Sequence, residues 1–232
     1  MTTTTAHPRA VGWRLHTPNA LVMVRLGLSA AIFAALARWS PDTAADSNSG
    51  IDGPDPTLLA AAALFVVAAL TDAADGYLAR KWNAITRFGR VMDPFADKVL
   101  VLGALVLLAG PAFSVEGRSI AGFTGWMVVL ILARELLVTS LRGLAEAGGT
   151  DASANWAGKA KMILQSVAVP GVILLLGTLP IDRATPINAG LAWATTIVTV
   201  FSAWPYIANA IRPTPSADPQ PAHRAGDEPT ET

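Results

Sequence analysis

The chain has no cysteine and carries little charge for its length. None of its 232 residues is a cysteine, which excludes disulfide bonds and thiolate metal sites and leaves the redox compartment undetermined. Charged residues make up only 15% of the chain, and 17 basic residues balance 17 acidic ones, so no bulk positive charge favours nucleic-acid binding. Apolar residues account for 52%, and the mean hydropathy is +0.44. This composition is typical of a membrane protein and unusual for a soluble domain.

Six apolar stretches are candidates for membrane-crossing helices, because a helix needs about 20 apolar residues to cross the hydrocarbon core. The stretches are residues 20–39, 57–78, 95–110, 122–143, 162–178 and 187–211. The third is short, and we interpret it as the apolar part of a longer helix that begins before Asp93, with Pro94 near its first turn. The sequence therefore predicts an all-α, polytopic membrane protein built as a bundle of six transmembrane helices.

The two ends of the chain differ from this apolar middle. Residues 1–10 are rich in threonine, and residues 213–232 are rich in proline and acidic residues. Both contain too little apolar surface to fold, so we expect disordered ends around a single membrane domain at 11–212. The segment 11–17, which contains Trp13, is expected to form a short interfacial helix.

Basic residues are distributed unevenly between the two sides of this six-helix topology. Most of the arginines and lysines outside the apolar stretches fall on the side of the two termini, whereas Arg38, Arg118 and Arg183 fall on the other side. By the positive-inside rule, both termini face the cytoplasm. We therefore expect a multi-pass protein of the cell's inner (plasma) membrane.

Four aspartates lie in the last part of the second apolar stretch and after it, on the expected cytoplasmic side. Asp72 and Asp75 share one helix face with Gly76 and Ala79, and Asp93 lies one helical turn before Asp97. A lone aspartate is usually a solvated surface residue, but clustered carboxylates at a membrane edge repel one another and are costly to desolvate. A hard divalent cation would compensate their charge. The cluster therefore predicts a site for Mg²⁺ or Mn²⁺.

These aspartates belong to a longer pattern, D-x2-D-G-x2-A-R-x8-G-x3-D-x3-D, which fills Asp72 to Asp97. The pattern resembles the signature of the CDP-alcohol phosphatidyltransferase family, and weaker similarity extends from about Pro18 to Ile211. The resemblance implies two divalent ions held by Asp72, Asp75 and Asp93, with Asp97 as catalytic base and further ligand. It also implies a homodimer. The residues that it implies for binding of the CDP-lipid are Asp72, Gly76, Ala79, Arg80 and Gly89.

Shorter matches resemble the branch of this family whose acceptor is glycerol 3-phosphate. They comprise Asn19 with Arg25, the segment Asp93 to Lys98, Arg134-Glu135, and Lys159 with Lys161. The implied reaction transfers a phosphatidyl group from CDP-diacylglycerol to glycerol 3-phosphate and releases CMP. Three alternatives remain open: phosphatidylglycerol as the acceptor, which gives cardiolipin, another CDP-alcohol phosphotransferase activity, and an ion or polyol-phosphate transporter.

Basic residues interrupt or border the later apolar stretches and suit an anionic acceptor. Ionisable residues within membrane helices are usually functional, although an internal Arg134–Glu135 ion pair or snorkelling remains an alternative here. Together with the residues from the shorter matches, these cations form the candidate set for binding the acceptor's phosphate. The set is Asn19, Arg25, Arg134, Arg142, Lys159 and Lys161.

Overall fold

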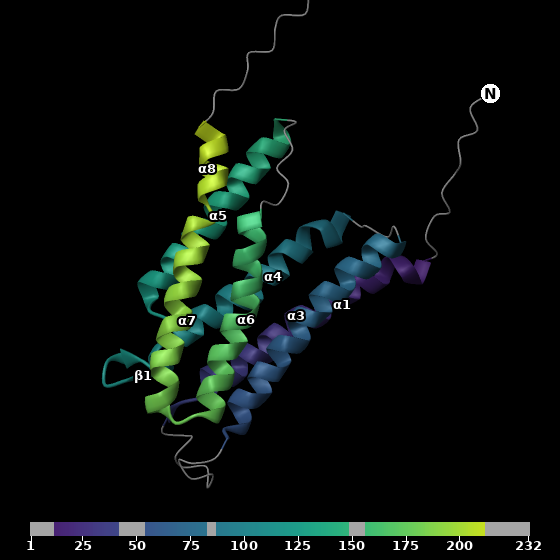
Figure 1. Ribbon diagram of the computed structural model, residues 1–232. Coiled ribbons are helices and arrows are strands. Elements are labelled where there is room, and N and C mark those ends of the chain that lie inside the picture. The colour runs from purple at the N-terminus through teal and green to yellow at the C-terminus, as the bar shows by residue number, and fades with distance from the viewer. Residues whose placement is uncertain (1–11, 42–53, 83–86, 149–155, 212–232) are drawn as a thin grey trace, which may run out of the picture.

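The computed structural model describes residues 12–41, 54–82, 87–148 and 156–211, and nearly all of them are helical (Figure 1). The helices are α1 (Gly12–Arg38), α3 (Pro56–Trp82), α4 (Arg87–Leu108), α5 (Gly125–Ala147), α6 (Trp156–Thr178), α7 (Ile181–Phe201) and the short α8 (Trp204–Ile211). Between α4 and α5 lie a 3-10 turn, η1 (Pro111–Phe113), and a small antiparallel hairpin of β1 (Ser114–Val115) and β2 (Arg118–Ser119).

The expected all-α architecture is confirmed, and each of the six apolar stretches lies mainly on one long helix. The helix α4 begins at Arg87, before Asp93, as predicted. Within the described residues, three segments are long and apolar enough to cross a membrane: Ala20–Arg38, Gly158–Thr178 and Ile181–Ile211. The chain is therefore a membrane protein.

The structure tests the predicted interfacial helix but not the predicted disordered ends. A separate interfacial helix is not confirmed, because Gly12 to Thr17 form the first turns of the continuous helix α1. The segments 1–10 and 213–232, predicted to be disordered, lie outside the described residues.

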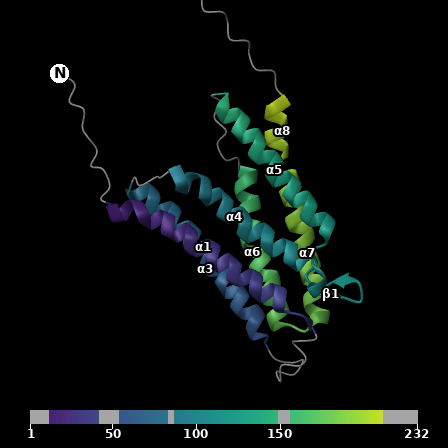
Figure 2. The ribbon, with the colours of Figure 1, turned by 180° about the vertical axis from the view of Figure 1, so that it is seen from behind.

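The long helices form two groups that α4 and α6 connect. Helix α1 packs along α3, and α7 packs against α5, while α6 contacts both α3 and α7 (Figures 1 and 2). Helix α4 contacts α1, α3, α5 and α6. Close approach is helped by a small residue: a Cβ atom at Gly103 of α4 would overlap the ring of Phe33 on α1.

Apolar side chains fill the interior and also cover much of the outer surface. The core includes Phe65, Leu105, Ile131 and Ile173, which are all fully buried. Large apolar side chains are also exposed on every long helix. Such outward apolar surface would be unfavourable in water, whereas lipid tails can cover it.

Asp55 joins three helix ends on the side of the bundle opposite the aspartate pattern. Its Oδ1 accepts hydrogen bonds from the backbone N–H groups of Thr57 (2.8 Å) and Leu58 (3.1 Å), which caps α3. Its Oδ2 accepts from Nε1 of Trp39, just after α1, at 2.6 Å. The backbone N–H of Asp55 donates to the carbonyl of Gly177 in α6 at 2.8 Å. One residue thus ties together the ends of α1, α3 and α6.

Replacing Asp55 with alanine should lower the free energy of unfolding by about 2–4 kcal/mol, because the helix cap is lost and the indole N–H of Trp39 loses its acceptor. Thermal or denaturant unfolding of the detergent-solubilised protein measures this loss. The matched control is Asp182→Ala, which removes an exposed aspartate from the first turn of α7. Equal losses in the two variants would contradict the role of Asp55.

Candidate active site

Helices α3 and α4 carry the whole aspartate pattern. Asp72 and Asp75 lie in the second half of α3, and Asp93 and Asp97 lie in the first half of α4. The structure describes the side chains of Asp72 and Asp97. The side chains of the other predicted metal and CDP-lipid residues, and that of Asn19, lie outside the described part; these residues are Asn19, Asp75, Gly76, Ala79, Arg80, Gly89 and Asp93.

Asp72 is paired with an arginine from a neighbouring helix. Nη1 of Arg25 on α1 lies 2.5 Å from Oδ1 of Asp72, and the Arg25 side chain is fully buried. The Asp72 side chain keeps 40% of its surface exposed, so this carboxylate can still contact a ligand. The predicted acceptor residue Arg25 is therefore located at a predicted metal ligand.

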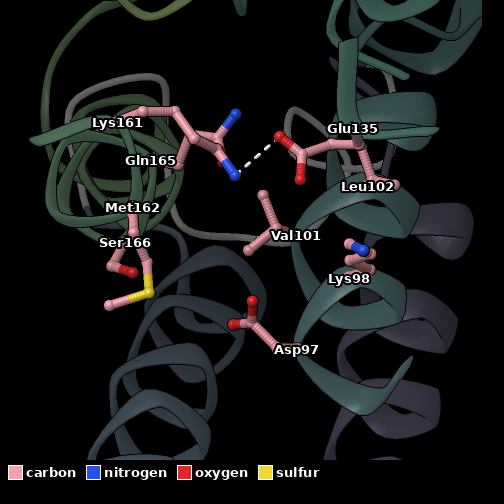
Figure 3. Close-up of a pocket in the computed structure, with 9 residues that line it drawn as sticks. All are labelled: Asp97, Lys98, Val101, Leu102, Glu135, Lys161, Met162, Gln165 and Ser166. Atoms are coloured by element: carbon pink, nitrogen blue, oxygen red, sulfur yellow. Dashed lines mark ion pairs between the residues drawn. The ribbon is translucent and has the colours of Figure 1, made fainter. Parts of the chain in front are cut away.

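Asp97 lines a pocket between α4, α5 and α6 (Figure 3). Glu135 and Lys161 form an ion pair on one side of this pocket, and Val101 lies between them and Asp97 (Figure 3). The last aspartate of the pattern therefore shares this pocket with Lys161 and Glu135.

The charged side of the pocket is built around Glu135. Its Oε1 lies 2.6 Å from Nζ of Lys161 on α6 and 3.0 Å from Nη1 of Arg134. Nη2 of Arg134 donates to the carbonyl of Ser202, just after α7, at 3.3 Å. The ion pair that the sequence left open for Arg134 and Glu135 is thus present within α5, and Lys161 extends it to α6.

The other described residues of the predicted acceptor set do not line the pocket. Lys159 is exposed and Arg142 is half-buried, and neither is among the described residues that line the pocket. Arg134 is buried next to Glu135 and also does not line it. Of the predicted acceptor set, Lys161 is the described residue that the structure places at the pocket wall with Asp97.

Several pocket residues were not in the predicted set. Nζ of Lys98 donates to Oγ1 of Thr139 at 2.6 Å, and Thr139 in turn donates to the carbonyl of Glu135 at 2.7 Å. Gln165, one turn after Lys161, donates to Oγ1 of Thr199 on α7 at 3.1 Å. The charge of Glu135 within an apolar stretch was a signal for its importance, but its contact with Lys161 depends on helix packing.

The described carboxylates fit a hard divalent cation in ligand type and accessibility. Asp72 and Asp97 come from two contacting helices, and Asp72 is partly exposed. Such cations prefer carboxylate oxygens, and Oδ1 of Asp72 is already oriented by Arg25. Asp72 and Asp97 could therefore hold a metal ion together with the aspartates that share their helices.

Fold and site together define a class of protein: an all-α membrane enzyme with an acidic, metal-compatible helix end beside a pocket that contains cations. The comparison with protein families specifies the class further. The chain belongs to the CDP-alcohol phosphatidyltransferase family, whose model matches residues 15–201. The resemblance seen in the aspartate pattern is thereby confirmed, and enzymes of this family use divalent metal ions.

The chain is similar to several bacterial enzymes named CDP-diacylglycerol–glycerol-3-phosphate 3-phosphatidyltransferase. It is 42% identical to the Bacillus subtilis (strain 168) enzyme over 149 residues, which cover 64% of this chain and 72% of the relative. Identity to the Sodalis glossinidius enzyme is 36% over 155 residues, covering 64% and 77%. Identity to the Escherichia coli (strain K12) enzyme is 43% over 116 residues, covering 47% and 58%.

Replacing Arg25 with glutamine should lower the free energy of unfolding by about 1–3 kcal/mol, because Asp72 loses its counter-charge while its partial exposure limits the loss. Denaturant unfolding in detergent measures the effect. The control is Ser29→Ala, one turn along α1, where a buried hydroxyl donates to the carbonyl of Arg25; we expect a loss below about 1 kcal/mol. Unchanged stability of the glutamine variant would refute a stabilising role for the pair.

Proposed function

We propose that this protein transfers a phosphatidyl group from CDP-diacylglycerol to glycerol 3-phosphate, forming phosphatidylglycerophosphate and CMP. The position of Asp97 carries this proposal: the last aspartate of the pattern lines one pocket with Lys161. A base and a buried cation in one pocket suit an acceptor that has both a hydroxyl and a phosphate. The names of the bacterial relatives support the same reaction.

The four aspartates have different roles in the proposed reaction. Asp72, Asp75 and Asp93 hold two divalent ions, Mg²⁺ or Mn²⁺, with Asp97 as a further ligand. When bound, these ions neutralise the pyrophosphate and stabilise the charge on departing CMP. Asp97 accepts the proton of the acceptor hydroxyl, whose oxygen forms a bond to the phosphorus of the phosphatidyl group while the bond from that phosphorus to CMP breaks.

The two substrates bind on different sides of Asp97. For the CDP-lipid, Gly76, Ala79 and Gly89 leave room for the cytidine and ribose, and Arg80 pairs with phosphate, alongside Asp72. For the acceptor, Lys161 is the principal phosphate-binding residue because its ammonium group lies in the pocket with Asp97. The surrounding candidates complete the acceptor site: Asn19, Arg25, Arg134, Arg142 and Lys159.

All six long helices cross the inner (plasma) membrane in this proposal, within a membrane domain at 11–212. Arginine and lysine outside the apolar stretches favour a cytoplasmic location for both termini and for the aspartates. Family membership further suggests a homodimer.

CMP release from CDP-diacylglycerol by the purified, detergent-solubilised protein tests the reaction. With Mg²⁺ present, we expect release with glycerol 3-phosphate and none with phosphatidylglycerol or inositol phosphate. A chelator should stop the release, and Mg²⁺ or Mn²⁺ should restore it, because the clustered carboxylates need a cation to bind the pyrophosphate.

Each other outcome of this assay has a distinct meaning. Release with phosphatidylglycerol would replace the proposed reaction with cardiolipin synthesis, and release with inositol phosphate would assign a different acceptor alcohol. Absence of release with all three acceptors would refute glycerol 3-phosphate as the acceptor and reopen the choice of acceptor. Release that persists in the presence of chelator would refute the proposed metal sites but not the transferase reaction.

Replacing Asp97 with asparagine should slow CMP release by at least about 100-fold, because the amide cannot accept the proton of the acceptor hydroxyl. Binding of CDP-diacylglycerol should persist, as measured by titration of the detergent-solubilised variant. The control is Asp182→Asn at the exposed start of α7, which should react like the wild type. Wild-type turnover in the Asp97 variant would show that another group acts as the base.

A further inference from the structure

One oxygen of Glu135 holds two cations next to the acceptor pocket. Oε1 lies 2.6 Å from Nζ of Lys161 and 3.0 Å from Nη1 of Arg134. All three residues are buried, and both Glu135 and Lys161 line the pocket (Figure 3). The Glu135 carboxylate is therefore the group that both cations share.

Lys161 needs a partner to have a defined position. Its ammonium group ends a flexible four-carbon chain and carries three donor hydrogens. The contact with Glu135 uses one donor and leaves others for a phosphate oxygen. Without Glu135, the ammonium group would have to be ordered at the moment of binding, which weakens binding.

Arg134 and Thr139 connect Glu135 to neighbouring elements of the fold. Arg134 connects it to the carbonyl of Ser202 at the end of α7, at 3.3 Å. The backbone carbonyl of Glu135 accepts a hydrogen bond from Thr139, whose Oγ1 also accepts from Lys98. The carboxylate is thus connected through Arg134 to the end of α7, and the backbone of Glu135 is connected through Thr139 to α4.

The charges of the described lining residues cancel, so net charge does not explain anion binding in this pocket. Asp97 and Glu135 are negative, and Lys98 and Lys161 are positive. An entering phosphate therefore gains most from correctly oriented donors. The direction in which the ammonium group of Lys161 points becomes the property that determines affinity.

We propose that Glu135 is a positioning residue of the acceptor site, which holds the ammonium group of Lys161 at the pocket wall for the acceptor's phosphate. This inference rests on the proposed function for the identity of the acceptor. It differs from two simpler roles. A carboxylate that competes with phosphate for Lys161 would weaken acceptor binding, and a purely structural ion pair would affect stability without affecting one substrate selectively.

The test compares Glu135→Gln with the wild type in the CMP-release assay. We expect the KM for glycerol 3-phosphate to rise about tenfold, the equivalent of one charge-assisted hydrogen bond, while the KM for CDP-diacylglycerol stays within about twofold. Glu135→Asp, which keeps the charge, should restore the acceptor KM in part. A lower acceptor KM in the glutamine variant would overturn the proposal in favour of competition, and an equal rise for both substrates would overturn it in favour of a structural role.

A double-mutant cycle with Lys161→Gln separates positioning from general damage. If Glu135 acts through Lys161, the double variant should have the acceptor KM of Lys161→Gln alone. Additive effects would contradict the proposal. The matched control is Thr195→Val in α7, where a fully buried hydroxyl has no hydrogen-bond partner among the described residues; both KM values should be unchanged.

Binding of inorganic phosphate, measured by calorimetry, tests the positioning role of Glu135 without turnover. If the wild type binds phosphate but does not use glycerol 3-phosphate, the proposed function fails while the role of Glu135 can still be measured. Glu135→Gln should then bind phosphate about tenfold more weakly, as should Lys161→Gln. Unchanged or tighter phosphate binding in Glu135→Gln would refute the positioning role whatever the substrate is.

Discussion

Buried charge inside an apolar helix bundle is stable only where an opposite charge lies in contact with it. Arg25 meets this requirement through Asp72, and Lys161 meets it through Glu135. Each of these pairs joins two different helices, α1 to α3 and α5 to α6. The requirement for pairing therefore helps to decide which helices come together, and it brings the chemically useful groups to one part of the bundle.

The two ends of α3 show how differently the protein uses polar groups. At the start of the helix, Asp55 has backbone and indole donors for its oxygens, and Trp39 beneath it stacks on Phe113 with ring centroids 4.8 Å apart. These polar groups have hydrogen-bond partners within the protein, so they stabilise the bundle. Near the other end, Asp72 keeps 40% of its side-chain surface exposed, so it retains capacity for a ligand.

Much of the architecture could be predicted from local patterns. The apolar stretches predicted the long helices, and the charged segment before residue 95 predicted that α4 begins before Asp93, because both properties depend on residues near in sequence. The roles of the basic residues could not be ranked in this way. Lys159 and Lys161 are two positions apart, yet one is exposed and the other is buried against Glu135, since helical geometry turns them to different faces.

The sequence by itself determined the family, the membrane character of the chain and the helices that carry the aspartates, since composition and spacing along one helix are local properties. Only the tertiary structure decided that Arg25 contacts Asp72, that Lys161 reaches Glu135, and that Asp97 lines one pocket with Lys161 and Glu135. Residues 47 positions apart, such as Arg25 and Asp72, meet through helix packing. Packing depends on the shape and burial of many side chains at once, which no short pattern contains.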